Sequence, residues 1–284
     1  MFVKSITFEI ILLFGLLINP LQTREQDFEH PFQDRLKGRK LLTIGDSLTA
    51  SCAWQGFLVN WFGLIWSQEE TQKGLDGHTP MAIGGTRVKP SDEKSIFMRS
   101  FDAPFYKPDI VLIYGGQNDR DPGIKSAKNP FDKPVEIVAW EKPYKLRVTN
   151  DTVSFISAYK GMVEMLMETC PKAKIYLVTQ MRVRADVGMV GKESPYNNKY
   201  NGIVRFSSFE EVLNWEKSDR FPKVEYIRAI GRFYGLPVID LWDNSGITDF
   251  NAKDFYGEPA YDCTQVHPNQ DGYQRMAECI ATYF

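Results

Sequence analysis

Short apolar runs alternate along the chain with longer segments in which apolar residues recur at helical spacing. Four of the five runs are nearly continuous in apolar residues, which is typical of parallel strands covered on both faces. The alternation itself is the pattern of an α/β fold. We therefore predict five parallel strands, at residues 40–44, 80–83, 109–114, 174–179 and 237–241.

Three longer segments have apolar residues at the spacing of an α-helix. Asp151 or Thr152 is a suitable N-cap for the first, and Pro171 ends it. Gly235 ends the second, and the third follows Pro268. Their apolar positions are Ile156, Tyr159, Val163 and Leu166, then Val224, Ile227 and Ile230, then Tyr273, Met276, Ala277 and Ile280.

Two segments interrupt the alternation. Residues 121–150 carry four prolines, and a hairpin is predicted within them at 135–148. Residues 188–204 are rich in Gly, Asn and Tyr and are predicted to form a loop. Both follow the C-terminal ends of predicted strands, where open α/β sheets bind ligands. They are either specificity elements or ordinary surface insertions.

The N-terminus resembles a secretory leader. An apolar stretch at 6–18 follows Lys4 and is too short for the roughly 20 residues that span a bilayer. Glu9 interrupts it and no small-x-small cleavage site follows, so an uncleaved N-terminal helix is the alternative. We predict a signal peptide at 1–23 and a secreted or periplasmic protein. A linker at 24–39 and one domain at 40–284 follow.

The composition is that of an ordinary globular protein. Of 284 residues, 43% are hydrophobic and 25% are charged, which excludes collagen-like, coiled-coil and wholly disordered chains. Basic and acidic residues number 34 and 36, so the net charge is -2. Such a chain has no basic field for nucleic acid or anionic lipid. We predict neither partner, and no stable membrane insertion once the leader is removed; the oligomeric state is left open.

Histidines and cysteines are too few and too scattered for a zinc site. We predict no metal ion and no organic cofactor. The four cysteines allow three full pairings, and at least two of them are predicted to be buried free thiols. They are Cys52, Cys170, Cys263 and Cys279.

The first predicted strand runs into the block GDS, so Ser47 stands on the turn that leaves the strand, two residues after Gly45. A serine on such a turn can act as a nucleophile if a base is adjacent, and the turn can direct backbone N–H groups at a developing oxyanion. Gly, Asp and Ser are also the commonest turn and N-cap residues, so this block alone does not identify a function.

Three further blocks accompany it. Gly84 and Gly85 lie in MAIGGTRV after the second predicted strand, where they permit a tight turn. Asn118 lies in LIYGGQND after the third, and its side chain can donate to the same oxyanion. His267 lies in QVHPNQDGY, whereas His30 and His78 fall in the linker and in a loop; they are weaker candidates for a base.

The four blocks in this order resemble the SGNH hydrolases, also called the GDSL esterase and lipase family, over nearly all of the predicted domain. The resemblance implies a flavodoxin-like three-layer α/β/α sandwich with a five-stranded parallel sheet, and an ester hydrolase. It implies that Ser47 is the nucleophile and His267 the base. The oxyanion hole would combine the N–H groups of Ser47 and Gly85 with the side chain of Asn118, and Gly84 replaces Gly85 if the alignment shifts by one residue.

The third catalytic position departs from the family pattern. The family's DxxH element would place an aspartate where this chain has Thr264, and Asp262 lies five residues before His267. Either Asp262 orients the histidine, or a backbone carbonyl does so in a Ser-His dyad, or the protein is a degenerate relative. The difference matters because loss of the orienting acid lowers the rate by about 10⁴ in the serine-protease template.

Other polar and aromatic residues near the predicted strand ends have two interpretations each. Asp46 and Asp119 are predicted to hold turns by hydrogen bonding. Three arginines either bind a substrate carboxylate or pair with acids, and four aromatic residues in the two insertions either stack on sugar rings or pack internally. These are Arg87, Arg182 and Arg184, and Trp140, Tyr144, Tyr196 and Tyr200.

Taken together, the residues predict an esterase that acts through Ser47 on a small-molecule or glycan ester, with O-acetyl groups of carbohydrates as the favoured substrate. A lipid or short-chain acyl esterase is the alternative. Against it, neither insertion has the amphipathic apolar face of a lipase lid. A non-catalytic glycan-binding relative that has lost the orienting acid is the rival from another class.

Overall fold

A computed structural model of the chain describes residues 36–67, 81–119, 153–185, 208–257 and 264–284, all within the compact unit Phe32–Phe284. The predicted leader, most of the linker, the predicted hairpin at 135–148 and the predicted loop at 188–204 lie outside these residues. So does Cys263, whereas Cys170 and Cys279 are buried free thiols, as predicted.

The core is a five-stranded parallel sheet in the order β2-β1-β3-β4-β6. Counted within the sheet, that order is 2-1-3-4-5, which confirms the predicted flavodoxin-like arrangement. Strands β1 and β3 are buried on both faces, and this explains their nearly continuous apolar sequences. The strands are β1 (Lys40–Gly45), β2 (Ile65–Trp66), β3 (Ile110–Tyr114), β4 (Lys174–Val178) and β6 (Val238–Ile239).

The prediction of a strand at 80–83 is wrong. Met81 and Ala82 are buried, but Ala82 forms only an isolated parallel bridge to Gly45 before the chain turns at residues 84–85. The residues there are apolar because they are buried beside the end of β1, and beyond the single bridge they do not pair as a strand of the sheet. The fifth strand is instead Ile65–Trp66, which is too short to stand out in the sequence.

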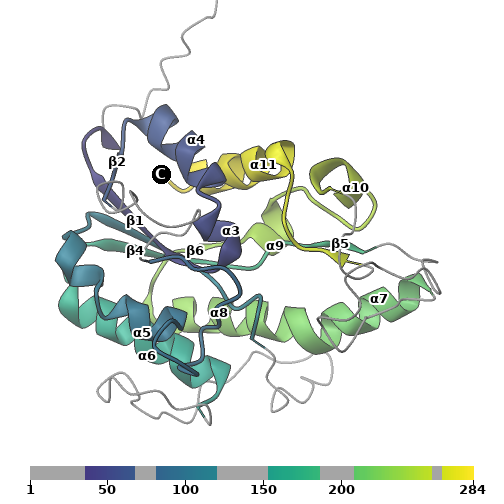
Figure 1. Ribbon diagram of the computed structural model, residues 1–284, viewed down its shortest axis with the longest axis horizontal. Helices are drawn as coiled ribbons and strands as arrows, with labels where there is room; N and C mark the ends of the chain where they lie inside the picture. The colour runs from purple at the N-terminus through teal and green to yellow at the C-terminus, as the bar shows by residue number, and fades with distance from the viewer. Residues whose placement is uncertain (1–35, 68–80, 120–152, 186–207, 258–263) are drawn as a thin grey trace, which may run out of the picture. The chain divides into compact units, whose positions relative to one another are not determined.

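Helices cover both faces of the sheet (Figure 1). One layer contains α3 (Ser47–Ala50), α4 (Ala53–Phe62) and α11 (Gln270–Ala281), and its side chains pack with Leu41 and Leu112 of the strands. The opposite layer contains α5 (Ile96–Ser100), α6 (Phe155–Thr169) and α8 (Phe221–Tyr234), which pack with alternate strand residues. The remaining elements are η2 (Ala103–Tyr106), β5 (Arg184–Ala185), α7 (Phe209–Trp215), the π-helical turn η4 (Glu216–Arg220), α9 (Leu241–Asn244), α10 (Ala252–Phe255) and β7 (Thr264–Gln265).

The three predicted helices are present, with one difference at a cap. Gly235 ends α8 in the left-handed conformation, and α11 begins after Pro268 with Asn269 as its N-cap. The predicted cap of α6 at residue 151 or 152 is wrong, because the Ser154 hydroxyl accepts the N–H of Ser157 instead. Serine suits an N-cap as well as Asp does, so the sequence pattern located the helix but not its first turn.

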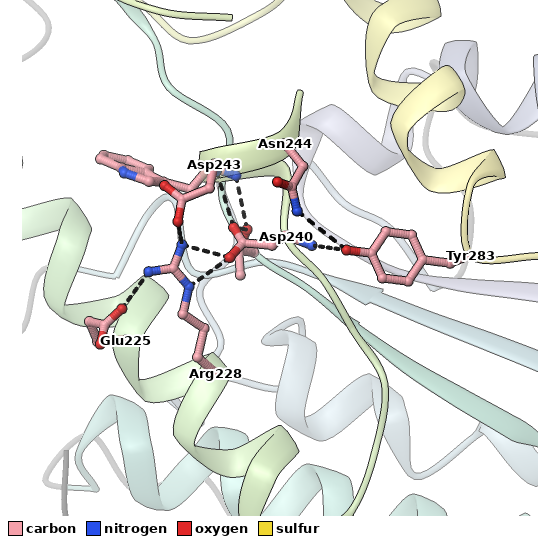
Figure 2. Close-up of polar contacts among 8 residues, drawn as sticks. Glu225, Arg228, Asp240, Asp243, Asn244 and Tyr283 are labelled. Carbon is pink, nitrogen blue, oxygen red and sulfur yellow. Dashed lines mark hydrogen bonds and ion pairs between the residues drawn. The ribbon is translucent and has the colours of Figure 1, made fainter. Parts of the chain in front are cut away.

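A charged network fixes α8 against the end of β6 (Figure 2). Arg228 on α8 donates from Nε to Asp240 at 2.7 Å and from Nη2 to Asp243 at 2.5 Å. Asp240 also caps α9 by accepting the N–H of Asp243, and its own backbone N–H donates to the hydroxyl of Tyr283 at 3.5 Å. The network therefore joins α8, the turn after β6 and the C-terminal residues at the carboxyl edge of the sheet.

Candidate active site

Ser47 is the first residue of α3 and follows β1 after a single intervening residue. That residue, Asp46, caps the helix by accepting the N–H of Leu48 at 3.2 Å. Gly45 is required because a Cβ there would lie 2.1 Å from Thr49 Oγ1 and 2.3 Å from the carbonyl oxygen of Tyr114. Strand and helix therefore meet closely, and the half-buried Ser47 stands at the carboxyl edge of the sheet.

His267 reaches Ser47 from the far end of the chain. Its Nε2 lies 2.9 Å from Ser47 Oγ, across 220 positions of sequence. Partial burial lowers the pKa of His267 from its ordinary value, so the imidazole is neutral at pH 7. A neutral imidazole at this distance can take the proton of a hydroxyl group.

Two short backbone pairings hold the segment that carries His267. On its N-terminal side, β7 pairs antiparallel with β5, which follows β4. On its C-terminal side, Pro268 forms a bridge with Tyr256, and the N–H of Asn269 donates to the carbonyl of Phe255 at 2.9 Å. The position of His267 thus depends on segments after β4 and α9 that are distant in sequence.

The two predicted oxyanion loops, 84–89 and 116–119, are bonded to each other. Asn118 Nδ2 donates to the carbonyl oxygen of Thr86 at 3.0 Å. Asp119 is fully buried, and its carboxylate accepts the N–H of Val88 at 2.8 Å and that of Lys89 at 3.0 Å. Asp119 thus holds a turn, as predicted.

Gly85 has φ +74°, in the left-handed region, and a Cβ there would meet no atom within 4 Å. Glycine is favoured at this position by its backbone conformation and not by lack of space. Gly84, the alternative in the sequence, is half-buried beside it. The exposed Gly85 turn leaves the backbone open to a ligand on this side of the loop.

Arg99 on α5 joins the end of β1 to the 84–89 loop, a contact that was not predicted from the sequence. Its Nη2 donates to the carbonyl of Gly45 and to Thr86 Oγ1, both at 2.9 Å. Thr86 Oγ1 in turn donates to the carbonyl of Ile83 at 2.7 Å. A single cation within the short apolar segment IFMRS is the only signal that marks Arg99 in the sequence.

Arg182 pairs with acidic side chains of the protein, which is one of the two interpretations given for it above. Its Nη1 lies 3.3 Å from Glu216 and 3.5 Å from Asp249, and the guanidinium stacks over the ring of Trp242. Arg87 is exposed, and Arg184 belongs to β5. Outside the described residues lie Asp262, His30, His78, Trp140, Tyr144, Tyr196 and Tyr200.

Within the described ranges, no cluster of three His, Cys, Asp or Glu side chains has the arrangement of a metal site. None of the helices there combines the length and apolar character needed to cross a bilayer.

Comparison with known proteins gives a family match and a shared fold. The sequence profile of the GDSL-like lipase/acylhydrolase family matches residues 43–275. A search of curated proteins finds no match. A solved protein from Lactobacillus plantarum superposes with a TM-score of 0.53 at 16% identity, over 87% of this chain and 96% of that one. A GDSL-like lipase from Bacteroides thetaiotaomicron superposes with a TM-score of 0.46 at 14% identity, over 86% and 87%.

Burial of Asp46 predicts a pH-dependent stability. Burial raises the pKa of Asp46 from 3.8 to about 7, so between these values the native state holds a proton that the unfolded chain has lost. Stability from this group therefore falls as pH rises through that window. The amide of Asp46→Asn does not titrate, so this variant should gain about 2–3 kcal/mol relative to wild type between pH 5 and pH 8.

Urea denaturation at the two pH values measures this gain. The same substitution at the exposed Asp254 of α10 is the matched control for loss of one carboxylate. A difference between Asp46→Asn and wild type that does not change with pH would contradict the assignment.

Proposed function

The chain belongs to the GDSL-like lipase/acylhydrolase family and is a hydrolase, and we propose that it is a serine esterase acting on carboxylic esters through Ser47. The observation that carries this proposal is the 2.9 Å separation of Ser47 Oγ and His267 Nε2. A nucleophile and its base within hydrogen-bonding distance are the minimum for acyl transfer.

The reaction has two halves. In the first, His267 Nε2 takes the hydroxyl proton of Ser47 while Oγ attacks the ester carbonyl carbon, and the carbonyl oxygen becomes an oxyanion. Collapse of this intermediate breaks the bond to the alkoxy group, which leaves with the proton from His267. In the second half, His267 activates a water that releases the acid and restores Ser47.

The oxyanion would be held by the N–H groups of Ser47 and Gly85 and by the side chain of Asn118. Asn118 Nδ2 carries two N–H bonds, and one donates to Thr86, which leaves the other for the oxyanion. Donors that are fixed before the reaction need no reorganisation when the charge develops. Thr86, held by Arg99, thus supports the orientation of the Asn118 amide.

For the substrate, we propose O-acetyl esters of carbohydrates. Aromatic residues stand in both segments that follow strand ends, at Trp140 and Tyr144 and at Tyr196 and Tyr200, and such side chains can stack on sugar rings. The net charge of -2 gives no attraction to anionic lipid surfaces. Export through the predicted leader at 1–23 would bring the enzyme to extracellular or periplasmic glycans.

The nucleophile can be identified directly. A serine-directed phosphonate should label Ser47 and abolish hydrolysis of p-nitrophenyl acetate, because Ser47 is the serine adjacent to a neutral imidazole. Ser47→Ala should neither label nor react, whereas Ser51→Ala is the matched control and should do both. Mass spectrometry of the labelled peptide locates the adduct, and labelling at another serine would defeat the assignment.

The acyl preference separates the substrate classes. We expect p-nitrophenyl acetate to be hydrolysed at least tenfold faster, by kcat/KM, than the octanoate, and acetate to be released from acetylated glycans. A preference for the longer chain would identify a lipid esterase instead. No turnover of any ester, with retained glycan binding, would identify a non-catalytic relative.

The orienting acid is proposed to be Asp262. If so, Asp262→Asn should lower kcat by about 10²–10⁴ with the fold intact, because an amide neither stabilises the imidazolium nor enforces the tautomer. Thr264→Ala, the control at the position where the family has aspartate, should have a much smaller effect. Loss of less than about tenfold in Asp262→Asn would favour a backbone carbonyl as the orienting group. Steady-state kinetics measure kcat for both variants, and circular dichroism checks that both are folded.

A further inference from the structure

Two cations from one helical face contact the loop 116–119. Lys223 on α8 is 1% exposed, and its Nζ donates to the carbonyl oxygen of Asp119 at 2.6 Å and to that of Gly116 at 3.3 Å. Arg220, at the end of η4, donates from Nη2 to the side chain of Gln117 at 3.2 Å. Three of the four loop residues are therefore held from this face, and the fourth is Asn118.

The second contact of each cation is to the surrounding scaffold. Arg220 Nη2 also donates to the carbonyl of Met181, just after β4, at 2.6 Å. Lys223 Nζ lies 3.5 Å from the carboxylate of Asp219, one turn earlier. The loop is thus tied both to the helix and to the end of the neighbouring strand.

Burying an ammonium group costs desolvation free energy, so a lysine buried at this position indicates a role for its charge or its donors. Burial lowers the pKa of Lys223 from its usual value, with Asp219 opposing the shift. An apolar side chain of the same length would fill the space without desolvating a charge. An apolar side chain has no donor, however, and could not bind the carbonyls of Gly116 and Asp119, which flank Asn118. Gly116 and Asp119 lie two and five residues after the end of β3, and no strand of the described sheet pairs with them; the carbonyl of Gly116 also accepts the N–H of Asp119 at 3.3 Å.

We propose that Lys223 is a positioning residue for the oxyanion hole. Its ammonium draws the carbonyls of Gly116 and Asp119 toward α8, and this fixes the intervening backbone so that the Asn118 amide faces the reacting centre. The inference rests on the proposed function, because it requires Asn118 to donate to the oxyanion. Lys223 itself touches no substrate and acts only through Asn118.

Kinetics of Lys223→Met test the proposal. Loss of the ammonium should lower kcat for p-nitrophenyl acetate about 10- to 100-fold, with KM changed less than about threefold, because an oxyanion donor acts in the transition state. Lys160→Met is the matched control. Lys160 on α6 is also buried, at 4% exposed, and its Nζ lies over the ring of Phe233, so removing this ammonium should leave kcat unchanged.

A double-mutant cycle with Asn118→Ala distinguishes positioning from a general effect on the fold. Asn118→Ala alone should lower kcat about 10²–10³-fold, and adding Lys223→Met should cost less than about threefold more. Multiplicative losses would show that Lys223 does not act through Asn118 and would overturn the inference. Wild-type kcat in folded Lys223→Met would overturn it while the proposed function stands. Wild-type kcat in Asn118→Ala would overturn the oxyanion role of Asn118 and this inference with it, whereas the proposed function itself fails only if Ser47→Ala retains activity.

Thermal unfolding of each variant accompanies the kinetics. If Lys223→Met does not fold, Lys223→Gln replaces it in the cycle, since its uncharged amide still donates to a carbonyl. Its kcat should lie between that of wild type and that of Asn118→Ala. A folded Lys223→Gln with wild-type kcat would overturn the proposal.

Discussion

At the carboxyl edge of the sheet, β1 and β3 end inside the protein, where backbone N–H and carbonyl groups lose their ladder partners and are shielded from water. Such groups need other partners, because an unpaired buried polar group costs free energy comparable to a lost hydrogen bond. Here charged side chains supply partners: Arg99 bonds the carbonyl of Gly45 and Lys223 bonds two carbonyls after β3, while Asp119 bonds two N–H groups of the adjoining 84–89 loop. The loops around Ser47 owe their shape to these three side chains.

The same burial shifts the pKa values of charged groups at the carboxyl edge of the sheet. Desolvation raises the pKa of Asp46 to about 7, raises that of Asp119, and lowers that of Arg99 to about 10. These shifts show that the surroundings of the loops favour uncharged forms. In such a medium a fixed N–H donor interacts more strongly with a developing negative charge than it would in water. The side chains that satisfy the backbone are thus buried, whereas Gly85 and His267 of the proposed site are exposed.

Helix α8 contacts the segments that follow two strands of the sheet, β3 and β6. Near its start Lys223 contacts the loop after β3, and one to two turns later Arg228 contacts Asp240 at the end of β6 (Figure 2). The π-helical turn η4 precedes the helix and places Arg220 beside Lys223. A shift of α8 relative to the sheet would therefore displace both the loop that contains Asn118 and the turn after β6.

Periodicity and motif alone determined the fold class, four of the five strands, the three main helices and the placement of Ser47 on a turn after a strand, because each of these follows from local spacing. The sequence did not distinguish a buried run from a paired strand at 80–83, since both are apolar. The motif resemblance implied that Ser47 and His267 act together, but only the tertiary structure brings them to 2.9 Å, and it alone decided that Arg99 and Lys223 face backbone 54 and 104 or more positions away. Those contacts depend on the crossing of distant elements, and a lone cation in an amphipathic helix carries no local sign of whether it will meet water or a buried carbonyl.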